Sequence, residues 1–300
     1  MRAKHSTMTS KHHPSIAFFG SSQFSVEVLT ALAQRGYEPS LLVTTPDRPA
    51  GRGQRLTAPP PKIWAESHSV EVLQPTDLSD PETVSQIAHQ APSSGGGWDL
   101  FIVASYGKIL PKELIYLPRH QTLNVHPSLL PKLRGPSPIQ TAILTEDRTG
   151  VTIIRLDERM DHGPIVAQRE VPIADWPPDA ITLEQELARV GGELLAKIIP
   201  SWVEGSISER SQDDSAATYS ALIKKEDALL DREHDDPESL LRKVRAYRQW
   251  PRAYFFAEHS GKTIRVIVTE ARLENGEFII ENVIPEGKSE MPYQTFLKTA

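Results

Sequence analysis

Two polar residues, Asn124 and His126, end an apolar stretch of the chain and are followed at once by Pro127. Residues two apart in a strand point to the same face of a sheet, so both side chains can reach one atom. An amide can donate to the oxyanion that forms when a carbonyl is attacked, and a charged imidazole can assist and then move protons. The pair predicts chemistry on a carbonyl, although an isolated Asn-X-His is more often a histidine bonded within a turn.

A third polar residue, Asp161, stands in a predicted turn beside Gly163, after a predicted strand that ends near Leu156. A carboxylate in that place would favour the charged form of His126 and orient its ring. Acidic residues in turns commonly serve only as local hydrogen-bond acceptors, so the residues alone leave this structural alternative open.

Several other kinds of chemistry are excluded or unsupported. The chain has no cysteine, which excludes disulfides, cysteine nucleophiles and thiolate metal sites and fits a reducing compartment. Gly20 stands alone after the first predicted strand, whereas dinucleotide binding requires three glycines, and no Walker loop occurs. His5, His12 and His13 lie at the start of the chain, where we expect no metal site.

The elements that must position Asn124 and His126 follow from the hydrophobic pattern. From Ser15 short apolar runs alternate with helical ones, which predicts the α/β class with a Rossmann-like, doubly wound, mostly parallel sheet. Ligands bind such sheets at the carboxyl ends of strands, where the pair stands. A long helix is predicted over 182–203, opened by a capping box of Thr182 and Gln185. The predicted strands cover 16–19, 41–45, 70–73, 100–104, 122–126, 151–156 and 165–171.

Length and composition indicate a globular protein. Three hundred residues with 39% hydrophobic and 24% charged content suit one large domain and a smaller one. The first residues lack the apolar core of a secretory signal, and no run approaches the roughly 18 apolar residues of a membrane span, so we expect a cytoplasmic protein. Residues 92–97 predict a flexible insertion. The expected division is a disordered tail (1–14), a catalytic domain (15–203), a linker (204–218) and a C-terminal domain (219–300).

The total net charge of −6 argues against a nucleic-acid partner, because phosphate binding usually requires a surplus of bases. The charges are, however, unevenly distributed along the chain. Residues 204–238 carry eleven acids and four bases, which predicts a linker that is most flexible over 206–217. Residues 239–273 carry eight bases and two acids. Strand-like pieces at 254–257, 263–269 and 277–283 predict a small β domain there. The acidic surplus therefore belongs largely to the linker.

Two basic segments could bind nucleic acid. The loop over 46–56 is made pliable by two glycines, and together with Lys62 shortly after it the loop offers the bases Arg48, Arg52 and Arg55. The second segment interleaves Tyr247 and Trp250 with the bases Arg242, Lys243, Arg245 and Arg248. On charge alone the first is as well explained as a solvated surface loop. For the second, Val244, Tyr247 and Trp250 could simply be core.

The stretch over 124–131 reads Asn-Val-His-Pro-Ser-Leu-Leu-Pro and is followed by Arg134-Gly135 and by Pro-Ile-Gln at 138–140. It resembles the formyl-transferring enzymes that use 10-formyltetrahydrofolate. Within them, Thr45 to Leu56 resembles the loop with which methionyl-tRNA formyltransferases enter the acceptor arm of tRNA. The resemblance runs from about residue 15 to the end, with further agreement at 104–111, at 150–153 with 160–163, at 218–219 with 224–227, at 244–247 with 250–251, and in the closing segment at 287–291 and 296–297.

This resemblance implies transfer of a formyl group from 10-formyltetrahydrofolate, the cosubstrate, to the α-amine of methionyl-initiator tRNA. Asn124, His126 and Asp161 would be the catalytic trio, and Arg52 would discriminate the acceptor end. We expect no metal, because a formyl group on an aryl amine is already activated, no membrane partner, and a monomer. The folate site would comprise Ser128, Leu129, Leu130 and Pro131, with Tyr106, Gly107, Ile109 and Leu110 forming a wall against the pterin.

The family's second domain is an open β-barrel that resembles an OB-fold, but only about 70 residues follow Leu230 here. We expect a shortened barrel, with its later strands missing between Glu270 and Glu286 and with weaker non-specific tRNA binding. Three alternatives stay open: formyl transfer to an amino sugar nucleotide, hydrolysis of 10-formyltetrahydrofolate, and RNA binding without catalysis. The basic loop speaks against a small acceptor, and the trio speaks against binding alone.

Overall fold

The computed structural model describes residues 13–50, 53–92, 96–259 and 261–298. Most of the predicted tail, part of the predicted insertion at 92–97, and Arg52 lie outside the described residues. The chain forms two compact units. The first contains the residues up to Leu123 together with Ala196–Ile207, and the second contains Asn124–Leu195 together with Ser208–Ala300.

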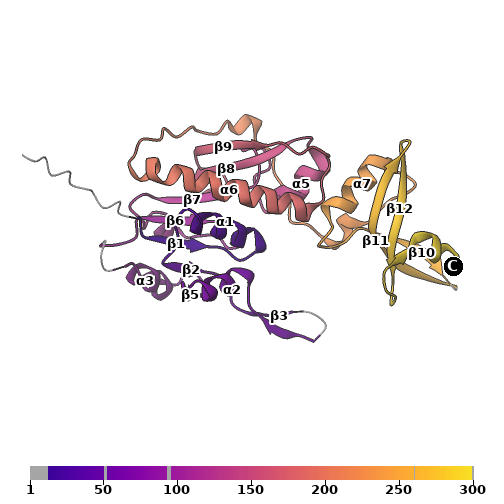
Figure 1. Ribbon diagram of the computed structural model, residues 1–300, viewed down its shortest axis with the longest axis horizontal. Helices are drawn as coiled ribbons and strands as arrows, with labels where there is room; N and C mark the ends of the chain where they lie inside the picture. The colour runs from indigo at the N-terminus through magenta and orange to yellow at the C-terminus, as the bar shows by residue number, and fades with distance from the viewer. Residues whose placement is uncertain (1–12, 51–52, 93–95, 260, 299–300) are drawn as a thin grey trace, which may run out of the picture. The chain divides into compact units, whose positions relative to one another are not determined.

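A seven-stranded sheet has the order β5-β2-β1-β6-β7-β8-β9 (Figure 1). In the first unit β1 pairs in parallel with β2 and β6, and β2 pairs in parallel with β5. In the second unit β8 and β9 are antiparallel. The predicted α/β class with a mostly parallel sheet is confirmed. The strands are β1 (Ile16–Phe19), β2 (Leu41–Val43), β5 (Glu71–Leu73), β6 (Leu100–Val103), β7 (Thr122–His126), β8 (Thr149–Arg155) and β9 (Ile165–Val171).

In the first unit, a serine side chain fixes the turn from which helix α1 begins. At the junction of β1 with α1, the Ser25 hydroxyl accepts from the backbone of Ser21 and Ser22 and donates to the Ala104 carbonyl at 2.7 Å. A Cβ at Gly20 would lie 2.6 Å from the Ser25 side chain, so close packing explains this lone glycine. The helices are α1 (Gln23–Ala33), α2 (Pro60–Ser67), α3 (Pro81–His89) and α4 (Lys112–Ile115).

The basic loop of the first unit is a hairpin rather than an irregular loop. Strands β3 (Arg48–Ala50) and β4 (Arg55–Thr57) pair antiparallel, and Figure 1 shows β3 extending away from α2. We call residues 46–57 the basic arm. Its base is fixed by Asp47, which accepts from Lys62 at 2.9 Å and from Gln74 at 2.7 Å. These hydrogen bonds, from Gln74 first and then Lys62, hold the pKa of the Asp47 carboxyl below its ordinary value.

Helix α6 (Ala180–Val203), whose first sixteen residues belong to the second unit, starts earlier than the predicted capping box. The carboxylate of Asp179 accepts from the backbone N–H of Ile181 at 3.0 Å and of Thr182 at 3.1 Å. The prediction of a cap at Thr182 was therefore wrong, because an aspartate three residues earlier satisfies the free N–H groups of the first turn. The other helices of this unit are α5 (Pro138–Thr145), α7 (Pro237–Ala246) and α8 (Tyr293–Lys298), with short 3-10 helices at Asp214–Ala216 and Lys225–Ala228.

The predicted small β domain is present as a separate antiparallel sheet. Its order is β10-β11-β12-β13, and helix α7 contributes Leu240 and Val244 to the core beneath it. Of the three residues that could simply be core, Val244 and Tyr247 are buried, whereas Trp250 is half exposed. The core interpretation therefore holds for the first two. The strands are β10 (Tyr254–His259), β11 (Lys262–Glu274), β12 (Glu277–Pro285) and β13 (Met291–Pro292).

The prediction that strands are missing between Glu270 and Glu286 was wrong. Strands β11 and β12 fill that stretch and are joined at Asn275 and Gly276, which have φ of 52° and 83°. Two consecutive residues at positive φ form the tight turn whose twist suits a hairpin, and Asn-Gly is its preferred sequence. Four strands are described in this sheet, against five in a complete OB-fold.

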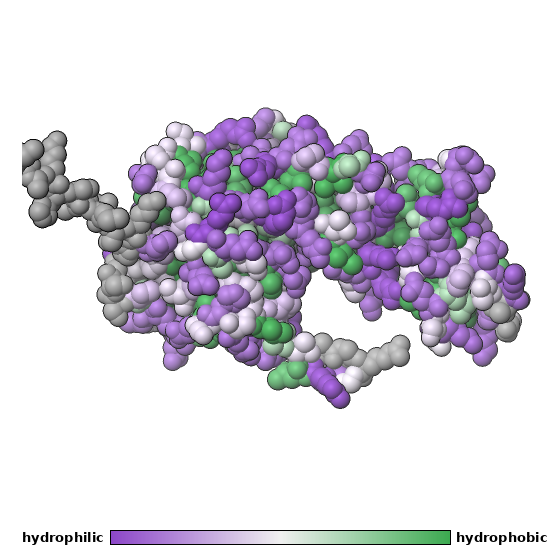
Figure 2. Space-filling view, viewed as in Figure 1, coloured by the Kyte–Doolittle hydropathy of each residue, from purple (hydrophilic) through white to green (hydrophobic). Residues whose placement is uncertain are grey.

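Hydrophilic residues predominate on the face of the molecule seen in Figure 2, with hydrophobic ones in smaller groups between them. Among the described residues, no helix has the length and apolar character needed to cross a membrane.

Candidate active site

Asn124 and His126 both lie at the carboxyl end of β7 and are almost fully buried, at 8% and 4% exposure. Nε2 of His126 lies 2.9 Å from the carbonyl oxygen of Leu133. A carbonyl can only accept, so Nε2 carries a proton, and in the neutral ring Nδ1 is the nitrogen with a free lone pair. Within the described residues, no hydrogen bond engages the amide of Asn124, so both of its N–H groups are free to donate.

Asp161 lies in the turn between β8 and β9, with its carboxylate beside His126. Oδ2 accepts from the backbone N–H of Gly135 at 2.8 Å, and Oδ1 lies 3.5 Å from Nδ1 of His126. Asp161 has φ of 50°, which is uncommon for a residue with a side chain. A Cβ on Gly163 would lie 1.8 Å from the Arg155 carbonyl oxygen, so only glycine fits there. The structure thus brings the three predicted residues together.

Leu133, which holds the imidazole, is itself fixed by a distant segment. Its N–H donates to the Thr218 hydroxyl at 2.9 Å, and the next N–H, of Arg134, donates to the Thr218 carbonyl at 2.9 Å. Gly135 has φ of 109°, and a Cβ there would lie 2.6 Å from the Ser220 carbonyl oxygen. Close approach of these two backbones therefore requires the glycine of the Arg-Gly pair. Sequence reasoning missed Leu133 and Thr218, because a backbone carbonyl leaves no signature in residue type.

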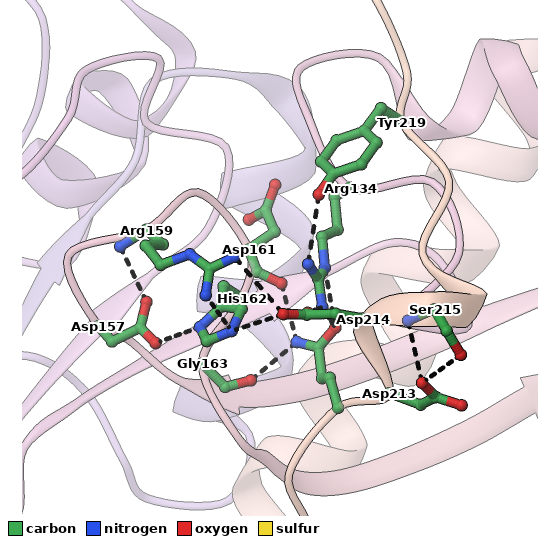
Figure 3. A network of polar contacts seen from close by, with 11 residues as sticks. Arg134, Asp157, Arg159, Asp161, His162, Gly163, Asp213, Asp214, Ser215 and Tyr219 are labelled. Carbon is green, nitrogen blue, oxygen red and sulfur yellow. Dashed lines mark hydrogen bonds and ion pairs between the residues drawn. The ribbon is translucent and has the colours of Figure 1, made fainter.

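A polar network surrounds the turn of Asp161 (Figure 3). Arg134 is 1% exposed, and its guanidinium donates to Gln212 at 3.0 and 2.8 Å, to Asp214 at 2.8 Å and to the Tyr219 hydroxyl at 3.4 Å. Burial by itself would lower the pKa of Arg134, but the hydrogen bonds with Asp214 and Tyr219 outweigh it and the pKa is raised. The same bond from Arg134 lowers the pKa of Asp214. Both groups are therefore charged at neutral pH.

His162, the neighbour of Asp161, is held within the same turn by Asp157 and Arg159 (Figure 3). Its Nδ1 lies 2.7 Å from the Asp157 carboxylate, and its Nε2 lies 2.7 Å from the guanidinium of Arg159. A guanidinium only donates, so Nε2 accepts and Nδ1 donates to Asp157. These contacts give His162 a structural part in shaping the turn, distinct from the part of His126.

The segment predicted as the most flexible part of the linker, 206–217, has defined partners. The carboxylate of Glu209 accepts from Arg155 at 2.7 and 2.9 Å. Backbone groups of Arg210 and Ile165 exchange hydrogen bonds at 2.8 and 2.9 Å. Acidic composition suggested flexibility because a charge count does not reveal that distant arginines pair with these acids.

Comparisons with known proteins identify the family of the chain. Residues 15–199 match the model of the formyl transferase family. The chain is 42% identical over 281 residues to the methionyl-tRNA formyltransferase of Chloroflexus aurantiacus, covering 92% of this chain and 86% of that relative. The chain belongs to the methionyl-tRNA formyltransferase family.

Two solved structures share its fold at lower identity. The methionyl-tRNA formyltransferase from Clostridium thermocellum has a TM-score of 0.58 and 16% identity, covering 91% of this chain and 98% of that one. HypX from Aquifex aeolicus in complex with tetrahydrofolic acid has a TM-score of 0.60 and 20% identity, covering 95% of this chain and 47% of that one.

The first predicted folate segment, Ser128 to Pro131, directly follows the active-site strand. The Ser128 hydroxyl donates to the Lys132 carbonyl at 2.6 Å, and the buried Leu130 packs with Ile154. Thr152 of β8 holds the backbone of the segment through the Ser128 carbonyl, at 2.6 Å, and the Leu130 N–H, at 3.1 Å. The side chains of Ser128 and Leu130 therefore shape the segment, while Leu129 and Pro131 are half-buried.

The second predicted folate segment, Tyr106 to Leu110, belongs to the first unit. Tyr106 is buried, and its hydroxyl has no hydrogen-bond partner among the described residues. Burial raises the pKa of this tyrosine. Gly107 has φ of 77°, Ile109 is 86% exposed and Leu110 is buried. A buried hydroxyl without a partner beside an exposed isoleucine fits a surface that a ligand completes.

The predicted tRNA-binding residues have different surroundings. In the first unit Arg48 and Arg55 are exposed on the basic arm, whereas Lys62 forms the ion pair with Asp47. In the second unit Arg242 is mostly buried and donates to the carbonyls of Ile143 and Glu146 at 3.1 and 2.8 Å. Arg242 also pairs with Asp147 and Glu238, so it joins α7 to the end of α5.

The remaining bases of α7 and the turn after it also have intramolecular partners. Lys243 pairs with Asp235 at 2.6 Å. Arg245 donates to the Pro177 carbonyl and Arg248 to the Thr269 carbonyl. The last two also line a cavity of about 510 Å³ together with Asp179. In the part of the chain that the structure describes, no group of three or more His, Cys, Asp or Glu could hold a metal ion.

Proposed function

We propose that the chain transfers a formyl group from 10-formyltetrahydrofolate to the α-amine of methionyl-initiator tRNA, in translation initiation in the cytoplasm. The observation that carries this proposal is the convergence of Asn124, His126 and Asp161 in a chain 42% identical to a methionyl-tRNA formyltransferase. All three residues belong to one unit of one chain, which suits action as a monomer.

The amine nitrogen attacks the formyl carbon, and the carbonyl oxygen becomes an oxyanion. The amide of Asn124, whose N–H groups have no other acceptor among the described residues, donates to that oxyanion. As the tetrahedral intermediate collapses, the bond between the formyl carbon and the folate N10 breaks. The new carbon–nitrogen bond to the amine remains, so the formyl group changes carrier without a redox change.

His126 moves the proton. Leu133 occupies its Nε2–H, so Nδ1 accepts the proton that the attacking amine loses and delivers it to N10 as that bond breaks. Asp161, 3.5 Å from Nδ1, stabilises the imidazolium between the two steps. The sequence led us to expect that a charged His126 would assist at the oxyanion as well as move protons, but in the proposed mechanism it only moves protons, because its Nε2–H bonds the Leu133 carbonyl.

For the folate, we propose contacts with Ser128, Leu129, Leu130 and Pro131 and, in the first unit, with Tyr106, Gly107, Ile109 and Leu110. The half-buried side chains of Leu129 and Pro131 and the Tyr106 hydroxyl, which has no partner among the described residues, support this assignment.

For the tRNA, we propose contacts with Arg48, Arg52 and Arg55 of the basic arm and with Arg245 and Arg248 near the end of α7. Lys62, Arg242 and Lys243 carry intramolecular ion pairs. We propose that these three act on tRNA binding by holding the arm and α7 in place.

A formyl-transfer assay tests the proposed function by offering 10-formyltetrahydrofolate with charged initiator tRNA, free methionine or an amino sugar nucleotide. We expect formylation of the charged tRNA alone, with little formate released when no acceptor is present. Formylation of the sugar nucleotide in preference to the tRNA would support the first alternative. Rapid formate release without an acceptor would support the hydrolase, and binding of tRNA without any transfer would support a non-catalytic RNA-binding protein.

A further inference from the structure

The side chain of Gln212 reaches the turn that carries Asp161 from a segment outside the match to the formyl transferase model, which ends at residue 199. Its Nε2 donates to the carbonyl oxygens of Asp161 and Gly163, each at 2.8 Å. Both donors of one amide therefore hold one turn.

The other end of this amide is fixed by Arg134. Oε1 of Gln212 accepts from Nε of Arg134 at 3.0 Å and from a terminal guanidinium nitrogen at 2.8 Å. An amide has two N–H donors and two acceptor lone pairs, and all four are used here. Only one orientation of the amide is possible, because reversing it would set its NH₂ against the guanidinium.

Arg134 also connects this contact to the other side of the active site. It follows Leu133, whose carbonyl accepts from Nε2 of His126. Gln212 therefore joins the segment that holds His126 to the turn that holds Asp161. We propose that Gln212 is a positioning residue of the formyl-transfer site, which sets the distance between the Asp161 carboxylate and Nδ1 of His126; this inference rests on the proposed function.

The turn needs such a restraint. Asp161 has φ of 50°, a left-handed conformation that a residue with a Cβ adopts only when its surroundings hold it. Its side chain is tied through Oδ2 to Gly135, and Gln212 supplies two further hydrogen bonds to the backbone of the turn. Without them the carboxylate is free to move away from His126, and proton transfer through Nδ1 slows.

The sharpest test is Gln212→Glu, which separates the two ends of the contact. A carboxylate still accepts from Arg134 but has no N–H to donate, and it sets a negative charge against the carbonyls of Asp161 and Gly163. We expect kcat to fall by about 10-fold to 100-fold, as for a displacement of about 1 Å at a reacting group. We expect KM for each substrate to stay within about twofold, because the protein itself takes up all four hydrogen-bonding positions of the Gln212 amide and leaves none for a substrate.

Asp213→Asn is the matched control, because Asp213 lies in the same segment and, among the described residues, its side chain accepts hydrogen bonds from Ser215 alone. Asparagine can cap the same short turn, so kcat should match that of the unmodified chain. A kcat for Gln212→Glu that equals the control, or a raised KM with unchanged kcat, would overturn the proposal. If Gln212→Glu does not fold, Gln212→Asn keeps the amide but is too short to reach both partners, and the same comparison applies.

A second measurement does not depend on activity. In NMR spectra of protein labelled with ¹⁵N-histidine, the ring signals of His126 can be assigned as those that disappear in the His126→Gln variant. We expect them to shift in Gln212→Glu and to stay in place in Asp213→Asn. If the unmodified chain formylates no acceptor, the proposed function fails, and only the His126 signals can test the positioning role. Unchanged signals in Gln212→Glu would then overturn that role. In an active enzyme, unchanged kcat overturns that role whatever the signals show.

Discussion

The Nε2 atom of His126 lies 2.9 Å from the carbonyl oxygen of Leu133, so a backbone carbonyl, rather than the carboxylate of Asp161, makes the hydrogen bond that fixes the imidazole. The carboxylate lies 3.5 Å from the other ring nitrogen, Nδ1. The ring is thus oriented by one group and electrostatically supported by another. In the mechanism we propose, this division leaves Nδ1 available for the reacting proton and leaves the oxyanion to Asn124.

Asn124→Ala should lower kcat by about 100-fold to 1000-fold, the scale for loss of one donor to an oxyanion. The affinity for a folate analogue should be unchanged, because the amide acts mainly as charge develops. Steady-state kinetics with charged initiator tRNA and equilibrium titration with 5-formyltetrahydrofolate check the two parts. Turnover close to that of the unmodified chain would remove Asn124 from the oxyanion site.

Gly163→Ala should prevent the turn of Asp161 from forming. The new Cβ would lie 1.8 Å from the Arg155 carbonyl oxygen, closer than any real contact, so β8 and β9 would have to separate locally. We expect a clear loss of thermal stability and of activity. Gly205→Ala is a control for glycine replacement, although its φ of 69° adds strain, because a Cβ there meets no atom within 4 Å. A Tm for Gly163→Ala at or above that of Gly205→Ala would contradict the structure.

Arg242→Ala should mainly lower the stability of the fold rather than directly weaken tRNA binding. Its guanidinium donates to the carbonyls of Ile143 and Glu146 and pairs with Asp147 and Glu238. Losing charge-assisted bonds of this kind costs about 2 kcal/mol, so denaturant unfolding should show a lower free energy of unfolding. An unchanged unfolding curve with weakened tRNA binding would instead make Arg242 a direct phosphate contact.

Changes in the basic arm should act on tRNA and leave the fold alone. Arg55 is exposed on β4, and Arg52→Ala and Arg55→Ala should each raise KM for charged tRNA without altering folate binding. If each arginine contacts one phosphate, the slope of log affinity against log salt should fall by about one. An unchanged KM and an unchanged slope in both variants would remove the arm from the tRNA interface.

Stability should fall at acid pH partly through Asp214. The hydrogen bond from Arg134 holds its pKa below the ordinary value of 3.8. A carboxyl whose pKa is lowered by folding stabilises the native state fully above its unfolded pKa, and this contribution disappears as the pH falls through the native pKa. In Asp214→Asn the Tm should therefore decline less than in the unmodified chain as the pH falls below about 4. Parallel declines would show that Asp214 does not contribute.

Much of the fold could be predicted because the spacing of apolar residues along the chain indicates which elements form and which of their faces are buried. The bounds of β7 and β9 agree with the predicted ranges. Pro127 marks the end of β7 and turn residues bound the apolar run of β9, so the limits of both strands are visible in the sequence. Parts of β11 and β12 were predicted at 263–269 and 277–283, but the extension of β11 to Glu274 and the turn at Asn275-Gly276 were missed, because polar residues on the exposed face interrupt the apolar pattern.

The sequence by itself was enough to predict the candidate reacting groups. Spacing of two in a strand placed Asn124 and His126 on one face, and the glycine at 163 marked the turn of Asp161. Only the tertiary structure decided what holds them: the Leu133 carbonyl, the Thr218 hydroxyl and the amide of Gln212. Gln212 and Arg134 are 78 positions apart in the chain. Local patterns fix which way a side chain faces, but its partner depends on how distant segments pack, and residue type does not record that.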